Sequence, residues 1–197
     1  MKLLTFSAII FILFTSCTHN GNDDIKTSCV QNEEISSDYS KYYIYFPGTE
    51  KNGYAKAIKI NKDWRASAKA EFVNGHLGIT LSTFLVENDD NLEAEYLFIN
   101  LINPVEKCYE ALNDELELYA KVSLFAVDDD VTENVYDVNL SVKNNKVQLD
   151  TFDLLNKRVA GKFMVSFKKN ERSLGGPWYN PDNLRIFNGE FHCNIVD

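Results

Sequence analysis

The chain has few residues of the kinds that carry out common catalysis or bind nucleic acid. Among its 197 residues are 3 His, and 20 Lys or Arg stand against 29 Asp or Glu, so the formal net charge is -9. No cluster of cations is present to neutralise phosphates, which argues against a nucleic-acid partner. The sequence contains no C-x-x-C, no P-loop and no G-x-S-x-G, and its histidines lie far apart. It therefore predicts no cofactor, no zinc site and no catalytic residue.

Long apolar runs are also scarce, and the longest begins near the N-terminus. Lys2 is followed by an apolar run from Leu3 to Phe14, which is shorter than the roughly 20 residues that a membrane-spanning helix needs. A cation followed by a run of this length is typical of a secretory signal peptide, which we assign to residues 1–16. The sequence Phe14-Thr15-Ser16-Cys17 then places small residues directly before a cysteine.

These four residues resemble the lipobox of bacterial lipoproteins in its looser Bacteroidota form. The resemblance implies cleavage between Ser16 and Cys17 and attachment of fatty chains to Cys17. Since two or more chains hold a protein stably at a bilayer, Cys17 would anchor the protein to a membrane without a spanning segment. The alternatives are an ordinary secretory peptide, with Cys17 in a disulfide, and a buried helix. We therefore expect a lipid-anchored protein of the outer membrane that faces the periplasm or the cell surface.

Residues 17–38 are polar and acidic, without apolar periodicity before Ile35, and we expect them to form a flexible tether. Asp23-Asp24, with Glu33-Glu34 further on, resemble the acidic signal that directs some Bacteroidota lipoproteins to the cell surface. A linker whose charge only aids solubility fits these residues equally well.

From Tyr39 onward apolar and polar residues alternate, as in strands with one buried face. About ten segments show this pattern or are further candidates, at 42–46, 54–60, 64–70, 77–82, 95–102, 116–125, 135–142, 146–152, 158–168 and from 186 on. Turn sequences such as Asn74-Gly75 favour antiparallel pairing of neighbours. Only 103–116 has a helical pattern, opened by Pro104. We predict one all-β domain over residues 39–197, either a single antiparallel β-sandwich or a partly open barrel of about ten strands.

The later strands resemble small Bacteroidota lipoprotein families of unknown function. The resemblance covers an early Trp64-Arg65-Ala66 strand and two C-terminal motifs, V-x-G-x-F at 159–163 and N-G-x-F at 188–191. It implies a β-rich envelope lipoprotein and supplies no catalytic residue. Gly161 and Gly189 fall on the inward face of their strands, where a missing side chain permits a close contact or a bend.

Besides Cys17 the chain has three cysteines, so at most one disulfide can form within it in an oxidising compartment. Cys193 lies on the inward face of its strand and is expected to be buried as a small apolar side chain. Cys29 and Cys108 lie in irregular segments that can approach each other. We favour a disulfide between them, and either other pairing is compatible with the sequence.

Carboxylates cluster at 87–93 and at 128–133. Asp128, Asp130, Thr132 and Asn134 have the alternating spacing of oxygen ligands in a calcium loop, but the glycine and the glutamate that complete such a loop are missing. We favour a solvated loop between strands, whose charge also protects strand edges from aggregation.

Trp178, Tyr179, Asn180 and Asp182 lie in a loop that is rich in glycine and proline. Exposed aromatic rings beside amides and an acid can stack on a sugar ring and bind its hydroxyls, so these four are candidate ligand-binding residues. Alternatively Trp178 folds down and plugs one end of the barrel or sandwich, which is the interpretation that we favour.

The sequence thus favours a membrane-anchored lipoprotein without enzymatic activity that binds an envelope protein or an extracellular ligand such as a glycan. The alternative is a hydrolase acting on glycan, with acids such as Asp128, Asp130 and Glu133 beside the Trp178 loop. An inhibitor or immunity-type partner also fits the acidic charge. Two carboxylates facing each other across a pocket lined by Trp178 would favour the enzyme.

Overall fold

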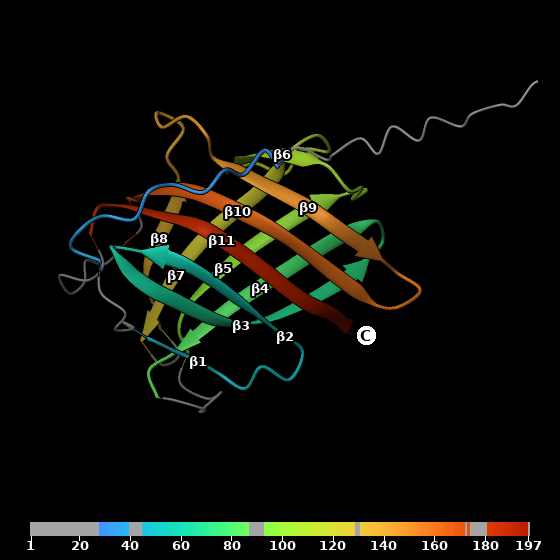
Figure 1. Cartoon of the computed structure of the whole chain (residues 1–197), viewed down its shortest axis with the longest axis horizontal. Helices are drawn as coiled ribbons and strands as arrows, with labels where there is room; N and C mark the ends of the chain where they lie inside the picture. The colour runs from blue at the N-terminus through green and yellow to red at the C-terminus, as the bar shows by residue number, and fades with distance from the viewer. Residues whose placement is uncertain are drawn as a thin grey trace, which may run out of the picture.

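The computed structural model describes residues 28–39, 45–86, 93–128, 131–171, 173 and 181–196. Within these ranges the fold is all-β without a helix, so none of the described residues forms a helix that could cross a membrane (Figure 1). The strands are β1 (Phe46–Pro47), β2 (Gly53–Lys59), β3 (Lys62–Val73), β4 (His76–Phe84), β5 (Glu93–Ile102), β6 (Cys108–Leu112), β7 (Ala120–Asp128), β8 (Val131–Val138), β9 (Lys146–Asp153), β10 (Arg158–Lys169) and β11 (Asn183–Val196). All of them belong to one sheet.

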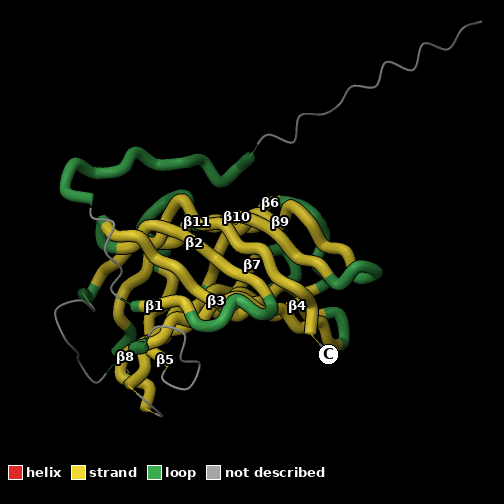
Figure 2. Tube along the Cα trace, turned by 60° about the horizontal axis from the view of Figure 1, so that its bottom comes forward, coloured by secondary structure: helices red, strands yellow, loops and turns green. Residues whose placement is uncertain are grey.

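This sheet curls into a partly open barrel (Figure 2). The longer strands pair antiparallel in chain order from β2 through β3, β4, β5 and β7 to β8, and β10 and β11 lead back to β2. The seam between β8 and β10 has only three residue pairs, against ten between β10 and β11. Beyond the seam, β9 pairs with the first half of β10, and β6 joins β9 to β7. The predicted all-β class is confirmed.

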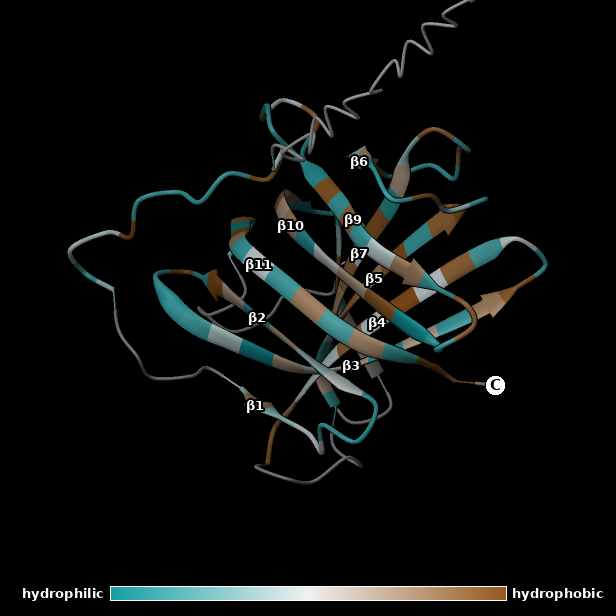
Figure 3. Cartoon of the chain, turned by 45° about the vertical axis from the view of Figure 1, so that its right-hand side comes forward, coloured by the Kyte–Doolittle hydropathy of each residue, from teal (hydrophilic) through white to brown (hydrophobic). Residues whose placement is uncertain are grey.

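Alternation along the strands sends every second side chain into the barrel. On β3, Trp64, Ala66 and Ala68 are at most 4% exposed, whereas Arg65 and Lys69 face the solvent. Figure 3 shows this alternation as bands of apolar and hydrophilic residues along the strands. The small side chains of β2 and β3 leave room for the larger ones of β10 and β11, so the interior is one continuous apolar core.

One of the two tight turns at the start of the sheet uses the residues that the sequence predicts. Asn74 and Gly75 link β3 to β4 with φ values of 52° and 82°, and Asn61 links β2 to β3 with φ 52°. Asparagine and glycine adopt this left-handed conformation more readily than other residues do. The predicted Asn74-Gly75 turn is therefore confirmed, whereas the turn between β2 and β3 is formed by Ile60 and Asn61, both with φ 52°.

The one or two helical turns that the sequence allows within 103–116 are not formed, and the structure has a strand there. The centre of this segment forms β6, in which Tyr109 and Ala111 are buried while Cys108 and Glu110 are exposed. That alternation has the period of a strand, and β6 is held by backbone pairing with β9 and β7. The helical assignment failed because five residues are too few to distinguish the two periods without the partner strands.

The two inward glycines of the last hairpin each lie opposite a phenylalanine. In the β10–β11 ladder Gly161 pairs with Phe191, and Phe163 pairs with Gly189. A Cβ atom on Gly189 would lie 2.7 Å from the Phe163 ring, and one on Gly161 would lie 2.2 Å from the Gln148 carbonyl oxygen. The predicted need for a missing side chain at these positions is confirmed, because the rings and the neighbouring strand occupy the space.

Gly161→Ala is expected to lower the free energy of unfolding by about 1–3 kcal/mol, because the Gln148 backbone can move only by disturbing the β9–β10 ladder. The matched control is Gly78→Ala on β4, where the added Cβ would meet only the edge of the Phe98 ring at 3.3 Å. Urea unfolding monitored by tryptophan fluorescence measures both variants. Equal midpoints for the two would contradict the close approach at Gly161.

Candidate functional site

A cluster of polar side chains lies inside one end of the barrel. Lys59 ends β2, Trp64 lies on β3 and Glu95 lies on β5, and all three are buried. The Glu95 carboxylate accepts hydrogen bonds from the Lys59 ammonium and from the Trp64 indole N–H, one at each oxygen. The Lys59 ammonium also lies 5.8 Å from the centre of the Tyr45 ring. Since a buried charge is costly unless it is paired and hydrogen-bonded, this triad is internally compensated.

Two inward side chains of β8 extend the polar cluster and lack hydrogen-bond partners among the described residues. Asn134 pairs with Ala126 of β7, which pairs in turn with Glu95, so the three lie side by side on the inner face. Both amide atoms of Asn134 and the hydroxyl of Tyr136 are buried and unpaired. Burial, with the nearby charges of Glu95 and Asp182, raises the pKa of Tyr136 far above its usual value, so the phenol keeps its proton.

The unpaired groups define what this end of the barrel can do chemically. A buried polar group without a partner costs about 1–3 kcal/mol. The Asn134 amide offers donors and an acceptor, and the Tyr136 hydroxyl offers one of each. By their chemistry these groups match a buried water, although neither residue lines any of the hollows found among the described residues. This end of the barrel supplies no pair of facing carboxylates among the residues whose side-chain burial is described, since Glu95 is the one buried acid there.

A second feature is the segment 28–39, which lies across the outside of the barrel and which we call the strap (Figure 1). A disulfide joins Cys29 to Cys108 at the start of β6, which is the pairing that the sequence favours. The Gln148 side-chain oxygen accepts hydrogen bonds from the Ser28 hydroxyl at 3.0 Å and from the backbone N–H of Cys29 at 2.8 Å. The first residues of the strap are therefore fixed to β6 and β9.

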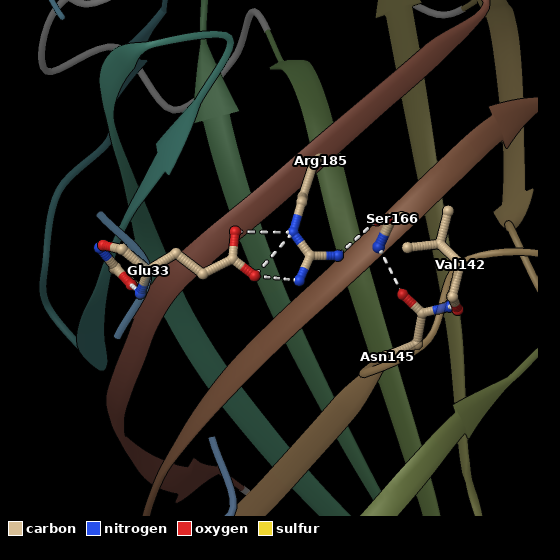
Figure 4. Close-up of polar contacts among 6 residues, drawn as sticks. Glu33, Val142, Asn145, Ser166 and Arg185 are labelled. Atoms are coloured by element: carbon tan, nitrogen blue, oxygen red, sulfur yellow. Dashed lines mark hydrogen bonds and ion pairs between the residues drawn. The ribbon is translucent and has the colours of Figure 1, made fainter. Parts of the chain in front are cut away.

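The middle of the strap is held by an ion pair that continues across the barrel surface (Figure 4). The Arg185 guanidinium of β11 donates to both oxygens of the Glu33 carboxylate and, at 2.5 Å, to the Ser166 hydroxyl of β10. The Ser166 N–H donates in turn to the side-chain oxygen of Asn145 at 2.8 Å. The Asn188 side chain also exchanges two hydrogen bonds with the Glu33 backbone. These contacts place the strap in one register on β10 and β11.

The structure differs here from the predicted flexible tether at 17–38, because residues 28–38 are docked. Val30 is buried against an apolar patch on the outer face of the barrel, formed by Ile58, Met164 and Phe187. The Tyr39 hydroxyl donates a hydrogen bond to Asp63. The polar composition of this segment hid the docking, and Val30 next to a cysteine was the one local signal for it.

Most of the candidate binding residues lie outside the described residues. These are Cys17, Asp130, Trp178, Tyr179 and Asn180. Asp182 is described and is exposed, with its carboxylate 3.7 Å from the Lys169 ammonium and its backbone oxygen bound to the Lys169 N–H. The sugar-stacking and plug interpretations of Trp178 both remain predictions.

The three described residues of the weak calcium candidate belong to two paired strands. Asp128 is the last residue of β7, and Thr132 and Asn134 belong to β8, which pairs with it. Asn134 points into the core and not towards a loop. A spacing of two residues is also the period of a strand, and Thr132 and Asn134 have this spacing because both lie on β8. Among the described residues no group of three His, Cys, Asp or Glu side chains could hold a metal ion.

Cys193 is the free cysteine of the described residues and is buried, as the sequence predicts. Burial raises the pKa of its thiol to about 12. His192 lies on the opposite, exposed face of β11, with its ring 5.3 Å from that of Tyr54. The thiol therefore has neither the low pKa nor the adjacent base of a nucleophilic cysteine.

Comparisons with protein-family models, curated proteins and solved structures found no match for this chain.

Proposed function

We propose that the protein is exported, is held at the outer membrane by fatty chains on Cys17, and acts there as a binding or structural protein of the envelope. The observation that carries the proposal is the Cys29–Cys108 disulfide, because disulfides persist in oxidising compartments such as the periplasm and the cell surface. It agrees with the apolar run and the lipobox-like sequence at residues 3–17.

The strap supports this arrangement because it shortens the connection to the anchor. Only residues 18–27 separate Cys17 from Ser28, where the docked segment begins. Fully extended, that connection spans at most about 40 Å. The barrel would thus be held close to the bilayer, by a fixed point beside β6 and β9.

The polar end of the barrel favours a binding role over a catalytic one. Both oxygens of Glu95 are occupied by Lys59 and Trp64, so this carboxylate is not free to act as an acid or a base. Asn134 and Tyr136 add unpaired polar groups beside it, but they are fully buried and include no further acid or base that ionises near neutral pH. Glycan binding at the Trp178 loop is the second candidate, favoured by the aromatic and amide composition of that loop.

Anchoring is tested by labelling cells with radioactive palmitate. The wild-type chain is expected to incorporate the label and to fractionate with membranes, because fatty chains on Cys17 hold it there. Cys17→Ala is expected to lose the label and to enter the soluble fraction. The matched control is Cys193→Ala, which removes a buried thiol and is expected to stay labelled. Equal labelling of the Cys17→Ala and wild-type chains, or no label in either, contradicts the proposal.

A further inference from the structure

Two loops near the start of the strap expose large apolar side chains. Leu116 and Leu118 lie between β6 and β7, and Leu140 and Val142 lie between β8 and β9. Leu118 is 67% exposed, Leu140 is 61% exposed, Leu116 is 49% exposed and Val142 is 38% exposed. We call these four residues the apolar ridge. Exposed apolar side chains that gather on one side of a molecule mark a contact surface more often than scattered ones do.

The leucines of the ridge point outward while the acids between them are bound back to the barrel. The Glu115 carboxylate accepts a hydrogen bond from Asn100 and lies 3.2 Å from the His76 ring nitrogen. The Glu117 carboxylate accepts a hydrogen bond from Asn103 at 3.1 Å. Leu116 and Leu118, the following residues, remain exposed. Both carboxylates are themselves exposed, so the ridge presents leucines beside acids whose hydrogen bonds tie them to neighbouring strands and turns.

The loops of the ridge are braced against one another. Asn113 exchanges two hydrogen bonds with the Val138 backbone, at 2.5 and 3.3 Å, and the Ala111 N–H donates to the Asn145 carbonyl. A hollow of about 480 Å³ lies between these loops and is lined in part by Leu140 and Val142. The apolar side chains are therefore presented from a braced surface, so their exposure is not the result of a frayed end.

The ridge and the strap belong to one side of the molecule. Asn145 donates to the Val142 carbonyl and accepts from Ser166, so the chain of contacts in Figure 4 runs from Glu33 of the strap to the ridge. The start of the strap is bonded to Cys108 of β6, the strand that leads into the Leu116 loop. Figures 1 and 2 both place the strap on the side of the barrel where β6 and β9 lie.

We propose that the apolar ridge docks into the headgroup region of the bilayer that carries the anchor. The inference rests on the proposed lipidation of Cys17. A bilayer is the expected contact of the ridge because the connection to the anchor is short. Ser28 lies beside β6, and only residues 18–27 separate it from Cys17. Cys17 is thus always within about 40 Å of Ser28, on the side of the barrel where the ridge lies. Lys143, exposed next to Val142, adds a cation that suits phospholipid headgroups.

The experiment uses the full lipidated protein in vesicles of phosphatidylethanolamine with a minor fraction of phosphatidylglycerol. Leu118→Cys carries an environment-sensitive maleimide dye, which spares the native cysteines because Cys193 is buried and Cys29 is bonded to Cys108. Leu155→Cys is the matched control, since Leu155 is 91% exposed in the turn at the far end of β9. Dye emission and its quenching by nitroxide-labelled lipids report contact with the bilayer.

Docking predicts a blue-shifted, lipid-quenched dye at position 118 and an aqueous spectrum at position 155. Aqueous spectra at both positions, on protein that carries palmitate, overturn the docking proposal and leave the anchor intact. Absence of palmitate from the purified protein overturns the anchor and the docking together. A blue shift at position 118 without vesicles that grows with protein concentration also overturns docking, because a second copy of the chain would then cover the ridge.

Discussion

Replacing Glu95 with alanine is expected to lower the free energy of unfolding by about 3–5 kcal/mol, which would leave little of the stability of a typical domain. The change removes the one carboxylate that compensates the buried Lys59 ammonium and that accepts from the Trp64 indole. An uncompensated charge inside an apolar core costs far more than the lost contacts. Urea unfolding followed by far-ultraviolet circular dichroism measures the loss.

The matched control is Glu190→Ala, which breaks the Lys56–Glu190 ion pair on the barrel surface. The Lys56 ammonium lies 2.7 Å from the Glu190 carboxylate, and both side chains are partly exposed to solvent. Loss of this pair is therefore expected to lower the free energy of unfolding by less than about 1 kcal/mol. A double variant, Lys59→Met with Glu95→Leu, is expected to recover most of the stability that Glu95→Ala loses, since it leaves only the Trp64 N–H unpaired. Similar midpoints for Glu95→Ala and Glu190→Ala would show that Lys59 is not buried as described.

Removing the disulfide is the change with the next largest expected effect. Cys29 and Cys108 are 79 positions apart, so their bond restricts a long loop of the unfolded chain. Cys29→Ser with Cys108→Ser is expected to cost about 2–4 kcal/mol. It is also expected to raise hydrogen exchange in the strap, because Gln148 and Val30 alone would then hold its first residues. Mass spectrometry of deuterium uptake at residues 28–39 measures this local effect.

Chemical reduction of the disulfide in the wild-type chain is the control for the double serine variant. A reducing agent is expected to lower the unfolding midpoint of the wild-type chain to that of the double serine variant, and to leave the variant itself unchanged. Cys193 does not complicate the comparison, because it forms no disulfide and is therefore unchanged by the reductant. Unchanged stability of the wild type on complete reduction would contradict the structural role of the bond.

The fold class could be predicted because the barrel repeats a single simple pattern. Alternation on β3, β4 and β10 distinguishes two faces without any knowledge of the partner strands, and the Asn74-Gly75 turn fixes one pairing. The strap could not be predicted in the same way. Its docking depends on side-chain contacts over long sequence distances, such as Glu33 with Arg185, and such contacts leave no periodic trace.

The polar end of the barrel has a signature in the sequence. Lys59 is in phase with the buried Ala55 and Ala57, and Glu95 is in phase with the buried Leu97. Opposite charges at inward positions of two strands predict a buried ion pair. Asn134 belongs to the same group, but its spacing from Thr132 and Asp128 fits a calcium loop as well as a strand, because both have a period of two.

The last strand determines when the barrel can form. β11 pairs with β10, with β2 and, at Ile195 and Val196, with β3, so residues near both ends of the domain must be present together. Contacts between such distant parts of a chain make folding slow. During the proposed export the edges of β2 and β10 would therefore stay unpaired until β11 emerges, and unpaired edges of this kind are prone to aggregation.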